Sequence, residues 1–233
     1  MIDLGIPPSV IKIWRGGHED YKTRKPDSAV MGKAWLKERK RDKYYLAAKR
    51  EKFRSRAAFK LLQIQERFHI IGKGWTVLDL GASPGGWSQV ARTLVGENGA
   101  VFAADLVGMT PIDGVKFLHG DLREVSFLEE LVSSLGAVDV VLSDMAPKLS
   151  GNKPYDQARA MELAGVALDV ANATLRNGGN FVTKVFRGED FEPFLSRVSS
   201  RFTTAKAHNP AASSRGSAEV YIIAKGFKGP RTR

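Results

Sequence analysis

Residues 77–87 of the chain read VLDLGASPGGW, an apolar run that ends in a glycine-rich turn. A helical pattern of apolar residues follows the turn. This order is typical of a strand whose carboxyl end opens a ligand site in a doubly wound α/β sheet. Glycine lets the backbone approach a ligand closely, and Pro84 stiffens the turn. The stretch therefore predicts a ligand-binding turn between a strand and a helix.

The spacing of the glycines separates the ligands that such a turn could hold. Dinucleotide sites use G-x-G-x-x-G, and nucleoside triphosphate sites use G-x-x-x-x-G followed by a lysine. Here Gly81, Gly85 and Gly86 read G-x-x-x-G-G, with no lysine after them. This spacing suits a nucleoside cofactor without a phosphate chain, and S-adenosylmethionine is the first candidate. A turn that serves packing alone is the alternative.

Composition limits the class of protein. The chain has 233 residues, 43% hydrophobic and 26% charged, which is ordinary for a soluble protein with one sizeable core. It has no cysteine and four scattered histidines, so we expect neither disulfides nor a metal site. No apolar run approaches the roughly 18 residues of a membrane span, and Asp3 and Pro7 interrupt any signal-peptide pattern. We therefore expect a cytoplasmic monomer that does not contact membranes.

Positive charge is concentrated at one end of the chain. The net charge is +11, and residues 1–56 hold 16 Lys and Arg against 7 Asp and Glu. The remaining residues hold 20 against 18, so they are nearly neutral. Such asymmetry favours a polyanionic partner, usually a nucleic acid. A solvated basic helix that only aids solubility is the alternative.

The chain divides into a basic arm or helix over residues 1–54, an α/β domain over 55–226 and a basic tail over 227–233. The expected strands are Thr76–Leu80, Ala100–Asp105, Val115–His119, Val138–Ser143, Asn180–Val185, Phe202–Ala207 and Ala218–Ala224. The expected helices are Lys33–Arg50, Ser55–Phe68 with Ser55 as its N-cap, Trp87–Leu94, Phe127–Leu135, Asp156–Leu175 and Asp190–Arg201. This alternation predicts a mainly parallel, doubly wound sheet with helices on both faces.

Acidic residues lie in or just after four successive expected strands. They are Asp79, Asp105, Asp121 and Asp144. Ligands bind beyond the carboxyl ends of strands in open α/β sheets. Asp105 is placed to accept hydrogen bonds from both hydroxyls of a ribose, and Asp121 from the exocyclic amine of an adenine. Together the acids predict a shared nucleoside pocket, although each alone could be a turn former or helix cap.

The residues after the fourth of these strands bear on the methyl acceptor. Residues 144–147 read DMAP, similar in outline to the Asn/Asp-Pro-Pro-Tyr motif of base-amino methyltransferases, whose aromatic residue stacks a flipped base. Here Pro147 is followed by Lys148 and Leu149, so the aromatic residue is missing. We therefore expect a hydroxyl rather than a base amine as the acceptor.

These segments together resemble the RrmJ/FtsJ family of S-adenosylmethionine-dependent RNA ribose 2′-O-methyltransferases. The resemblance covers about residues 47–224 and rests on Ser55–Leu61, Leu78–Trp87, Leu142–Pro147, Phe181–Phe186 and Ser213–Tyr221, in the family's order and spacing. Ser83 replaces the alanine more usual in the turn, a small change. The resemblance implies a Rossmann-like class I methyltransferase fold.

The resemblance also implies site residues. The family's Lys-Asp-Lys-Glu catalytic tetrad falls on Lys60, Asp144, Lys184 and Glu219. The residues expected to bind S-adenosylmethionine are Asp79, Gly81, Gly85, Gly86, Trp87, Asp105, Asp121 and Asp144.

The chemistry of methyl transfer to a ribose hydroxyl gives Lys184 a role. The hydroxyl is a weak nucleophile, so the enzyme must align it with the methyl group and remove one proton. Lys184 lies within FVTKVF, which otherwise reads as a buried strand. We expect it to be the general base. The alternative is that it positions the hydroxyl electrostatically and the proton leaves late to solvent.

The basic segment is expected to grip RNA phosphates, which gives affinity with little sequence information. The candidate contacts are Lys37, Arg39, Lys40, Arg41, Lys43, Lys49, Arg50, Lys52, Arg54 and Arg56. By resemblance, the substrate is a uridine in the A-loop of the large-subunit (23S) ribosomal RNA. A transfer-RNA ribose methyltransferase of the same family is the nearest alternative. A non-catalytic RNA-binding assembly factor and a small-molecule methyltransferase are more distant ones.

Overall fold

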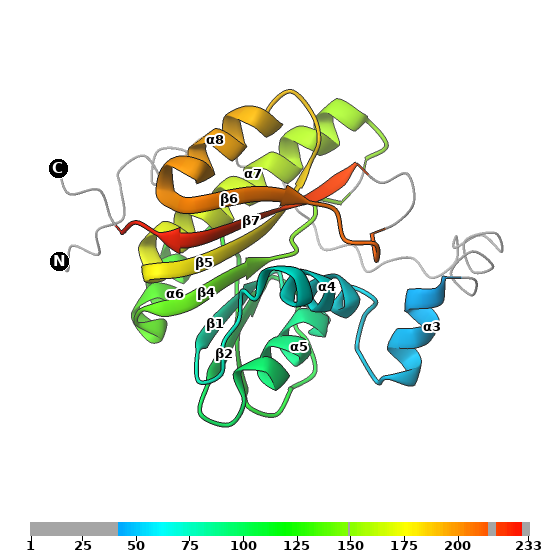
Figure 1. Ribbon diagram of the computed structural model, residues 1–233, viewed down its shortest axis with the longest axis vertical. Coiled ribbons are helices and arrows are strands. Elements are labelled where there is room, and N and C mark those ends of the chain that lie inside the picture. Colours follow the sequence, from blue (N-terminus) through cyan, green and yellow to red (C-terminus); the bar gives the residue numbers. More distant parts are fainter. Residues whose placement is uncertain (1–41, 149, 214–217, 230–233) are drawn as a thin grey trace.

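The computed structural model describes residues 42–148, 150–213 and 218–229 (Figure 1). Its helices are α3 (Lys43–Arg50), α4 (Ala58–Phe68), α5 (Gly86–Val95), α6 (Val125–Leu135), α7 (Lys153–Thr174) and α8 (Phe191–Arg201). Its strands are β1 (Thr76–Leu80), β2 (Ala100–Asp105), β3 (Val115–His119), β4 (Val138–Ser143), β5 (Leu175–Phe186), β6 (Phe202–His208) and β7 (Glu219–Phe227). The predicted alternation of strands and helices is confirmed.

The strands form one seven-stranded sheet in the order β3-β2-β1-β4-β5-β7-β6. Strands β1 to β5 pair in parallel, and β7 runs antiparallel to both β5 and β6. The chain builds the sheet outward from β1 to β3 and then returns to place β4 on the other side of β1. This reversal between β1 and β4 is the point at which doubly wound sheets bind their ligands.

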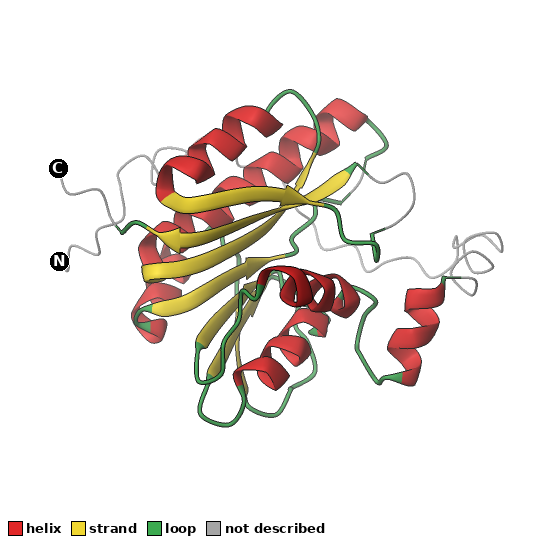
Figure 2. Cartoon of the chain, in the orientation of Figure 1, coloured by secondary structure: helices red, strands yellow, loops and turns green. Residues whose placement is uncertain are grey.

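Helices cover both faces of the sheet, as predicted (Figure 2). One apolar core joins the sheet to α6, α7 and α8, and a second joins it to α4 and α5. Side chains alternate between the faces of a strand, so Leu78 and Leu80 of β1 enter the first core while Val77 enters the second. All three are fully buried, as a parallel strand covered on both faces requires.

Several element boundaries differ from the prediction. Strand β5 begins at Leu175, where the sequence predicted the end of a helix, and it is therefore longer at its start. Helix α7 begins at Lys153 instead of Asp156, because the side chain of Asn152 caps it by accepting a hydrogen bond from Tyr155 N at 3.3 Å. Strand β7 continues to Phe227, three residues beyond the predicted end.

The start of α4 corrects a second prediction. Ser55 does not cap this helix: the N-cap position falls on Ala57, without a side-chain hydrogen bond. Ser55 contributes its carbonyl oxygen instead, which accepts from Ala58 N at 3.3 Å. The helix expected over residues 33–50 is described from Lys43 onward and is capped by Asp42. Its first part lies outside the described residues.

Candidate active site

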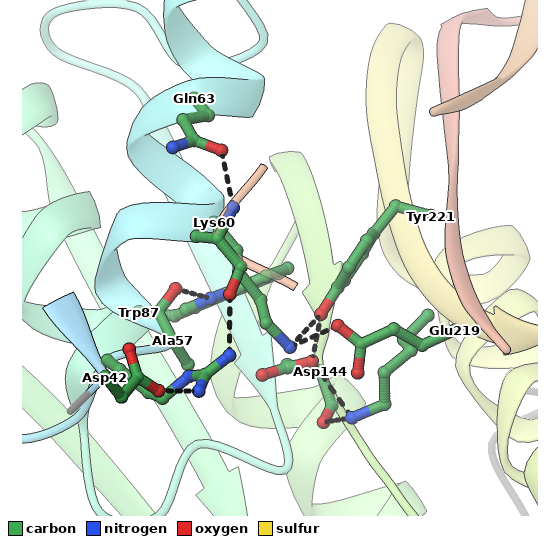
Figure 3. Close-up of polar contacts among 11 residues, drawn as sticks. Asp42, Ala57, Lys60, Gln63, Trp87, Asp144, Glu219 and Tyr221 are labelled. Atoms are coloured by element: carbon green, nitrogen blue, oxygen red, sulfur yellow. Dashed lines mark hydrogen bonds and ion pairs between the residues drawn. The ribbon is translucent and has the colours of Figure 1, made fainter. Parts of the chain in front are cut away.

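Side chains from α4, β5, β7 and the residue after β4 meet at the carboxyl end of the central strands. Lys184 lies near the end of β5, Asp144 directly follows β4, and Glu219 begins β7. The antiparallel register of β5 and β7 places Lys184 opposite Tyr221. Lys60 reaches the site from α4. Figure 3 shows the labelled members of this group turned toward one another.

Asp144 and Tyr221 connect the two lysines. Lys184 Nζ donates to the main-chain oxygen of Asp144 at 2.6 Å and to its Oδ1 at 3.0 Å. The Tyr221 hydroxyl donates to the same Oδ1 at 2.6 Å. Lys60 Nζ donates to the Tyr221 hydroxyl oxygen at 3.1 Å and pairs with Glu219 Oε1 at 2.5 Å. The structure therefore brings the four predicted catalytic residues into one hydrogen-bonded group.

Burial and charge set the protonation of the two groups at the centre. Lys60 and Lys184 expose only 8% and 7% of their surfaces, and Tyr221 is fully buried. Burial alone would raise the pKa of Asp144, but the ammonium groups of Lys184 and Lys60 and the Tyr221 hydroxyl together hold it below its ordinary value. Burial, with the charges of Asp144 and Glu219, raises the pKa of Tyr221 well above its ordinary value. Asp144 is thus a carboxylate and Tyr221 a phenol that can donate.

Tyr221 is the member of this group that sequence reasoning missed. It lies two residues after Glu219 on β7, so both side chains point to the same face of the strand. That spacing is the signal that could have identified it. An aromatic residue in an apolar strand, VYIIA, is more simply explained as core, and its hydroxyl contacts depend on the antiparallel register with β5.

The glycine turn is closely packed against other segments of the chain. Gly81 and Gly85 have φ values of +71° and +106°, which L side chains rarely adopt. A Cβ on Gly81 would lie 2.4 Å from Met145 Cγ, and one on Gly85 would lie 2.7 Å from Ile112 Cδ1. A Cβ on Gly86 would lie 2.3 Å from Ser55 Oγ. The turn can therefore keep its place beside Asp144 only with glycine at these positions.

Asp105 accepts a hydrogen bond from the glycine turn, and Asp79 accepts one from the helix that follows the turn. Asp79 is buried, with Oδ2 accepting from Ser88 Oγ at 2.6 Å and with Oδ1 lacking any hydrogen-bond partner in the described part of the chain. Burial raises its pKa to about 7. Asp105 accepts from Ser83 N at 2.8 Å and from Val107 N at 2.7 Å, and burial raises its pKa as well. Asp105 thus joins the glycine turn to the loop after β2.

We expect the stability of the unliganded protein to depend on pH through Asp79. Its folded-state pKa lies above the unfolded value of about 3.9, so folding is most favourable at acidic pH and weakens as the pH rises through about 7. Asp79→Asn removes this titrating group, so only the wild type loses stability through it as the pH rises. The difference in unfolding free energy, variant minus wild type, should therefore increase by about 2 kcal/mol from about pH 5.5 to about pH 8.5. Urea denaturation at the two pH values measures this difference. The matched control is Asp113→Asn, at an exposed carboxylate, whose unfolding free energy should follow that of the wild type with pH. The expectation would be contradicted if the unfolding free energies of Asp79→Asn and the wild type differed by the same amount at both pH values.

Two other residues expected at the cofactor site make contacts within the protein. Asp121 accepts from Arg123 Nε at 2.9 Å and forms an ion pair with the same guanidinium at 2.5 Å. Burial alone would raise the pKa of Asp121, but these contacts lower it. Trp87 is buried, donates from Nε1 to the Ala57 oxygen at 2.8 Å, and has its ring centroid 5.7 Å from that of Tyr221 (Figure 3). Trp87 therefore connects the glycine turn to the start of α4 and, through Tyr221, to the hydrogen-bonded group of predicted catalytic residues.

The predicted RNA contacts fall into three groups. Four lie outside the described residues: Lys37, Arg39, Lys40 and Arg41. Four are exposed on or just after α3: Lys43, Lys49, Arg50 and Lys52. Arg54 and Arg56 are half-buried and donate to groups of the protein itself, Arg56 to Asp42 and to the Ala212 oxygen at 2.8 Å. No group of three His, Asp or Glu side chains within the described residues is placed to hold a metal ion. No helix among them is long and apolar enough to cross a membrane.

The sheet order and the placement of the site define a Rossmann-like methyltransferase fold, which known structures share. Fibrillarin from Aeropyrum pernix, crystallised with bound S-adenosyl-L-methionine, is 16% identical with a TM-score of 0.52, over 73% of this chain and 74% of fibrillarin. A crystal structure from Clostridium thermocellum, described as that of an rRNA methylase, is 18% identical with a TM-score of 0.50, over 72% of this chain and 97% of that one.

A family model for FtsJ-like methyltransferases matches residues 53–227, and the chain belongs to this family. The predicted family is thereby confirmed. A crystal structure described as a ribosomal RNA methyltransferase from Plasmodium falciparum is 25% identical. Its TM-score is 0.66, and the match covers 76% of this chain and all of that one.

Proposed function

We propose that this protein methylates the ribose 2′-hydroxyl of an RNA nucleotide, and that its substrate is a uridine in the A-loop of large-subunit (23S) ribosomal RNA. Membership of the FtsJ-like methyltransferase family supports methyl transfer. The Plasmodium falciparum structure, described as a ribosomal RNA methyltransferase, supports ribosomal RNA as the substrate. The positive charge of residues 1–56 supports a polyanionic substrate of this kind.

The observation that carries the proposal is how Asp144 holds Lys184. To act as a general base, Lys184 must first lose a proton from its ammonium group, and the neutral amine then has two N–H bonds and one lone pair in a tetrahedral arrangement. Asp144 offers two acceptors to Nζ, its main-chain oxygen at 2.6 Å and its Oδ1 at 3.0 Å. These take the two N–H bonds and leave the lone pair for an incoming hydroxyl. This arrangement supports the proposal that Lys184 Nζ takes the proton of the ribose 2′-hydroxyl.

The other members of the group hold this arrangement in place. The Tyr221 hydroxyl donates to the Asp144 oxygen that Lys184 also uses, so the carboxylate cannot rotate without losing two contacts. Lys60, held by Glu219 and Tyr221, adds a positive charge that favours the ionised form of Asp144. On this proposal, Lys60 and Glu219 would also bind the ribose that Lys184 deprotonates.

The residues around the glycine turn fit S-adenosylmethionine. Gly81 and Gly85 have the positive φ values that this tight turn requires, and the turn has no lysine to bind phosphate. The unpartnered Asp79 Oδ1 suits an amino group, and the exposed side chains of Leu106 and Val107 after Asp105 suit a flat base. The cofactor, when bound, supplies an activated methyl group on a sulfonium. Asp105 would bind its ribose, and Asp144 would lie near its methionine end.

The test is methyl transfer from labelled S-adenosylmethionine to large ribosomal subunits and to bulk transfer RNA, both from cells that lack this protein. Resistance to alkaline cleavage maps a 2′-O-methyl group. We expect label as a 2′-O-methyluridine in the large-subunit RNA. Label in transfer RNA alone would overturn the ribosomal substrate and retain the chemistry. Label in neither RNA, with the cofactor still bound, would overturn methyl transfer and favour an RNA-binding assembly factor.

A further inference from the structure

We propose that Arg54 is a positioning residue that ties the two walls of the cofactor site together, instead of contacting RNA phosphate. The proposal rests on the proposed function in taking S-adenosylmethionine as the ligand. One wall is the glycine turn after β1, and the other is the loop over residues 106–114 between β2 and β3. Arg54 belongs to neither wall and lies about 30 residues before the turn.

The guanidinium of Arg54 donates to main-chain oxygens in both walls. One terminal nitrogen donates to the Pro84 oxygen in the turn at 3.3 Å and to the Thr110 oxygen in the loop. The other donates to the Pro111 oxygen at 2.6 Å. The planar guanidinium presents its donors in a fixed fork, so three carbonyl groups from two segments are held in one geometry. Arg54 therefore fixes the distance between the turn and the loop.

The base of the Arg54 side chain is itself anchored. Arg54 N donates to Gln89 Oε1 on α5 at 2.8 Å, and Gln89 Nε2 donates to the Lys52 oxygen at 3.3 Å. The Arg54 Cδ lies 3.1 Å from the place that a Cβ on Gly85 would take. The arginine thus rests on the helix that starts at the turn, and its contacts hold the loop over that turn.

These two walls carry the groups that would bind the nucleoside. Asp105 already joins them by accepting from Ser83 N and Val107 N. The exposed Leu106 and Val107 belong to the loop that Arg54 holds. A loop that is fixed before binding loses less conformational entropy when the ligand binds. Loss of the Arg54 contacts is therefore expected to weaken cofactor binding.

The same contacts argue against a phosphate role. A guanidinium binds phosphate through its fork of N–H donors, and in Arg54 that fork already faces protein carbonyls. Arg50, four residues earlier on α3, has a side chain that is 79% exposed and forms an ion pair with the adjacent Glu51. Arg50 therefore provides a matched arginine in the same basic segment, on an exposed surface where phosphate could reach it.

The experiment compares Arg54→Ala, Arg54→Lys and Arg50→Ala in the full chain. Isothermal titration with S-adenosylhomocysteine measures the cofactor site, and binding of the proposed ribosomal RNA at several salt concentrations measures phosphate contacts. We expect both Arg54 variants to bind S-adenosylhomocysteine about tenfold more weakly, because hydrogen bonds from a charged donor are lost. Their RNA salt slopes should match the wild type. Arg50→Ala should lower that slope by about one and leave S-adenosylhomocysteine binding unchanged.

Arg54→Lys keeps the charge but cannot present the planar fork, so it separates geometry from charge and guards against misfolding of the alanine variant. Hydrogen exchange of residues 106–114 without ligand should be faster in Arg54→Lys than in the wild type. Unchanged S-adenosylhomocysteine binding in both Arg54 variants, or an RNA-binding salt slope reduced by about one in Arg54→Ala, would overturn this inference and leave the proposed function standing. A wild-type protein that does not bind S-adenosylhomocysteine would overturn the proposed function and this inference with it.

Discussion

Replacing Lys184 with alanine is expected to lower the rate of methyl transfer by about a thousandfold or more, because the ribose hydroxyl then has no base within reach. Binding of S-adenosylmethionine should stay near the wild-type value, since the proposed role of Lys184 is toward the ribose hydroxyl and Lys184 is not among the residues expected to bind the cofactor. Single-turnover transfer from labelled S-adenosylmethionine to large ribosomal subunits measures the rate, and isothermal titration measures the binding.

Lys184→Arg separates the base from the positioning alternative. Arginine keeps a positive charge that can orient a hydroxyl, but it is not deprotonated in proteins and cannot act as a base. We expect this variant to be as inactive as Lys184→Ala. Substantial transfer by Lys184→Arg would support electrostatic positioning of the hydroxyl, and full activity of Lys184→Ala would remove Lys184 from the mechanism.

The positions of the strands, and the acidic residues that follow them, were predictable because buried parallel strands leave a clear pattern of apolar residues in the sequence. Residues 138–143, VDVVLS, are almost continuously apolar and end just before Asp144, so both the strand and its carboxyl-end acid follow from the sequence. The same holds for β1 and the glycine turn. Lys184 was conspicuous because a charged residue within a buried strand requires a partner.

The contacts within the site were less predictable, because they depend on register and on distant segments. The roles of Tyr221 and Glu219 follow from the antiparallel pairing of β7 with β5, and no local pattern specifies that pairing. Arg54 and Arg56 read as part of a basic surface, yet their partners lie in loops 56 and 156 residues away along the chain. The start of β5 was missed because residues 176–179, RNGG, which follow its first residue Leu175, resemble a turn.

Asp144→Asn is expected to reduce both stability and activity, because it removes the carboxylate that pairs directly with the buried Lys184. Deleting one partner of a buried ion pair costs about 3 kcal/mol, since the remaining charge stays without compensation. The pKa of Asp144 lies below its ordinary value, so this contribution is complete above about pH 4 and is lost only as the pH falls through that lowered value. Urea denaturation near pH 7 measures the loss, and methyl transfer should fall at least about a hundredfold as Lys184 loses its orientation.

The matched control is Asp169→Asn on α7, an ion pair with Arg197 at 3.2 Å in which the arginine is 49% exposed. Surface pairs of this kind contribute at most about 1 kcal/mol, so this variant should stay close to the wild type in stability and activity. A similar small loss in Asp144→Asn would mean that Lys184 does not depend on this carboxylate. Normal stability together with lost transfer would instead mean that Asp144 acts in catalysis without holding the site together.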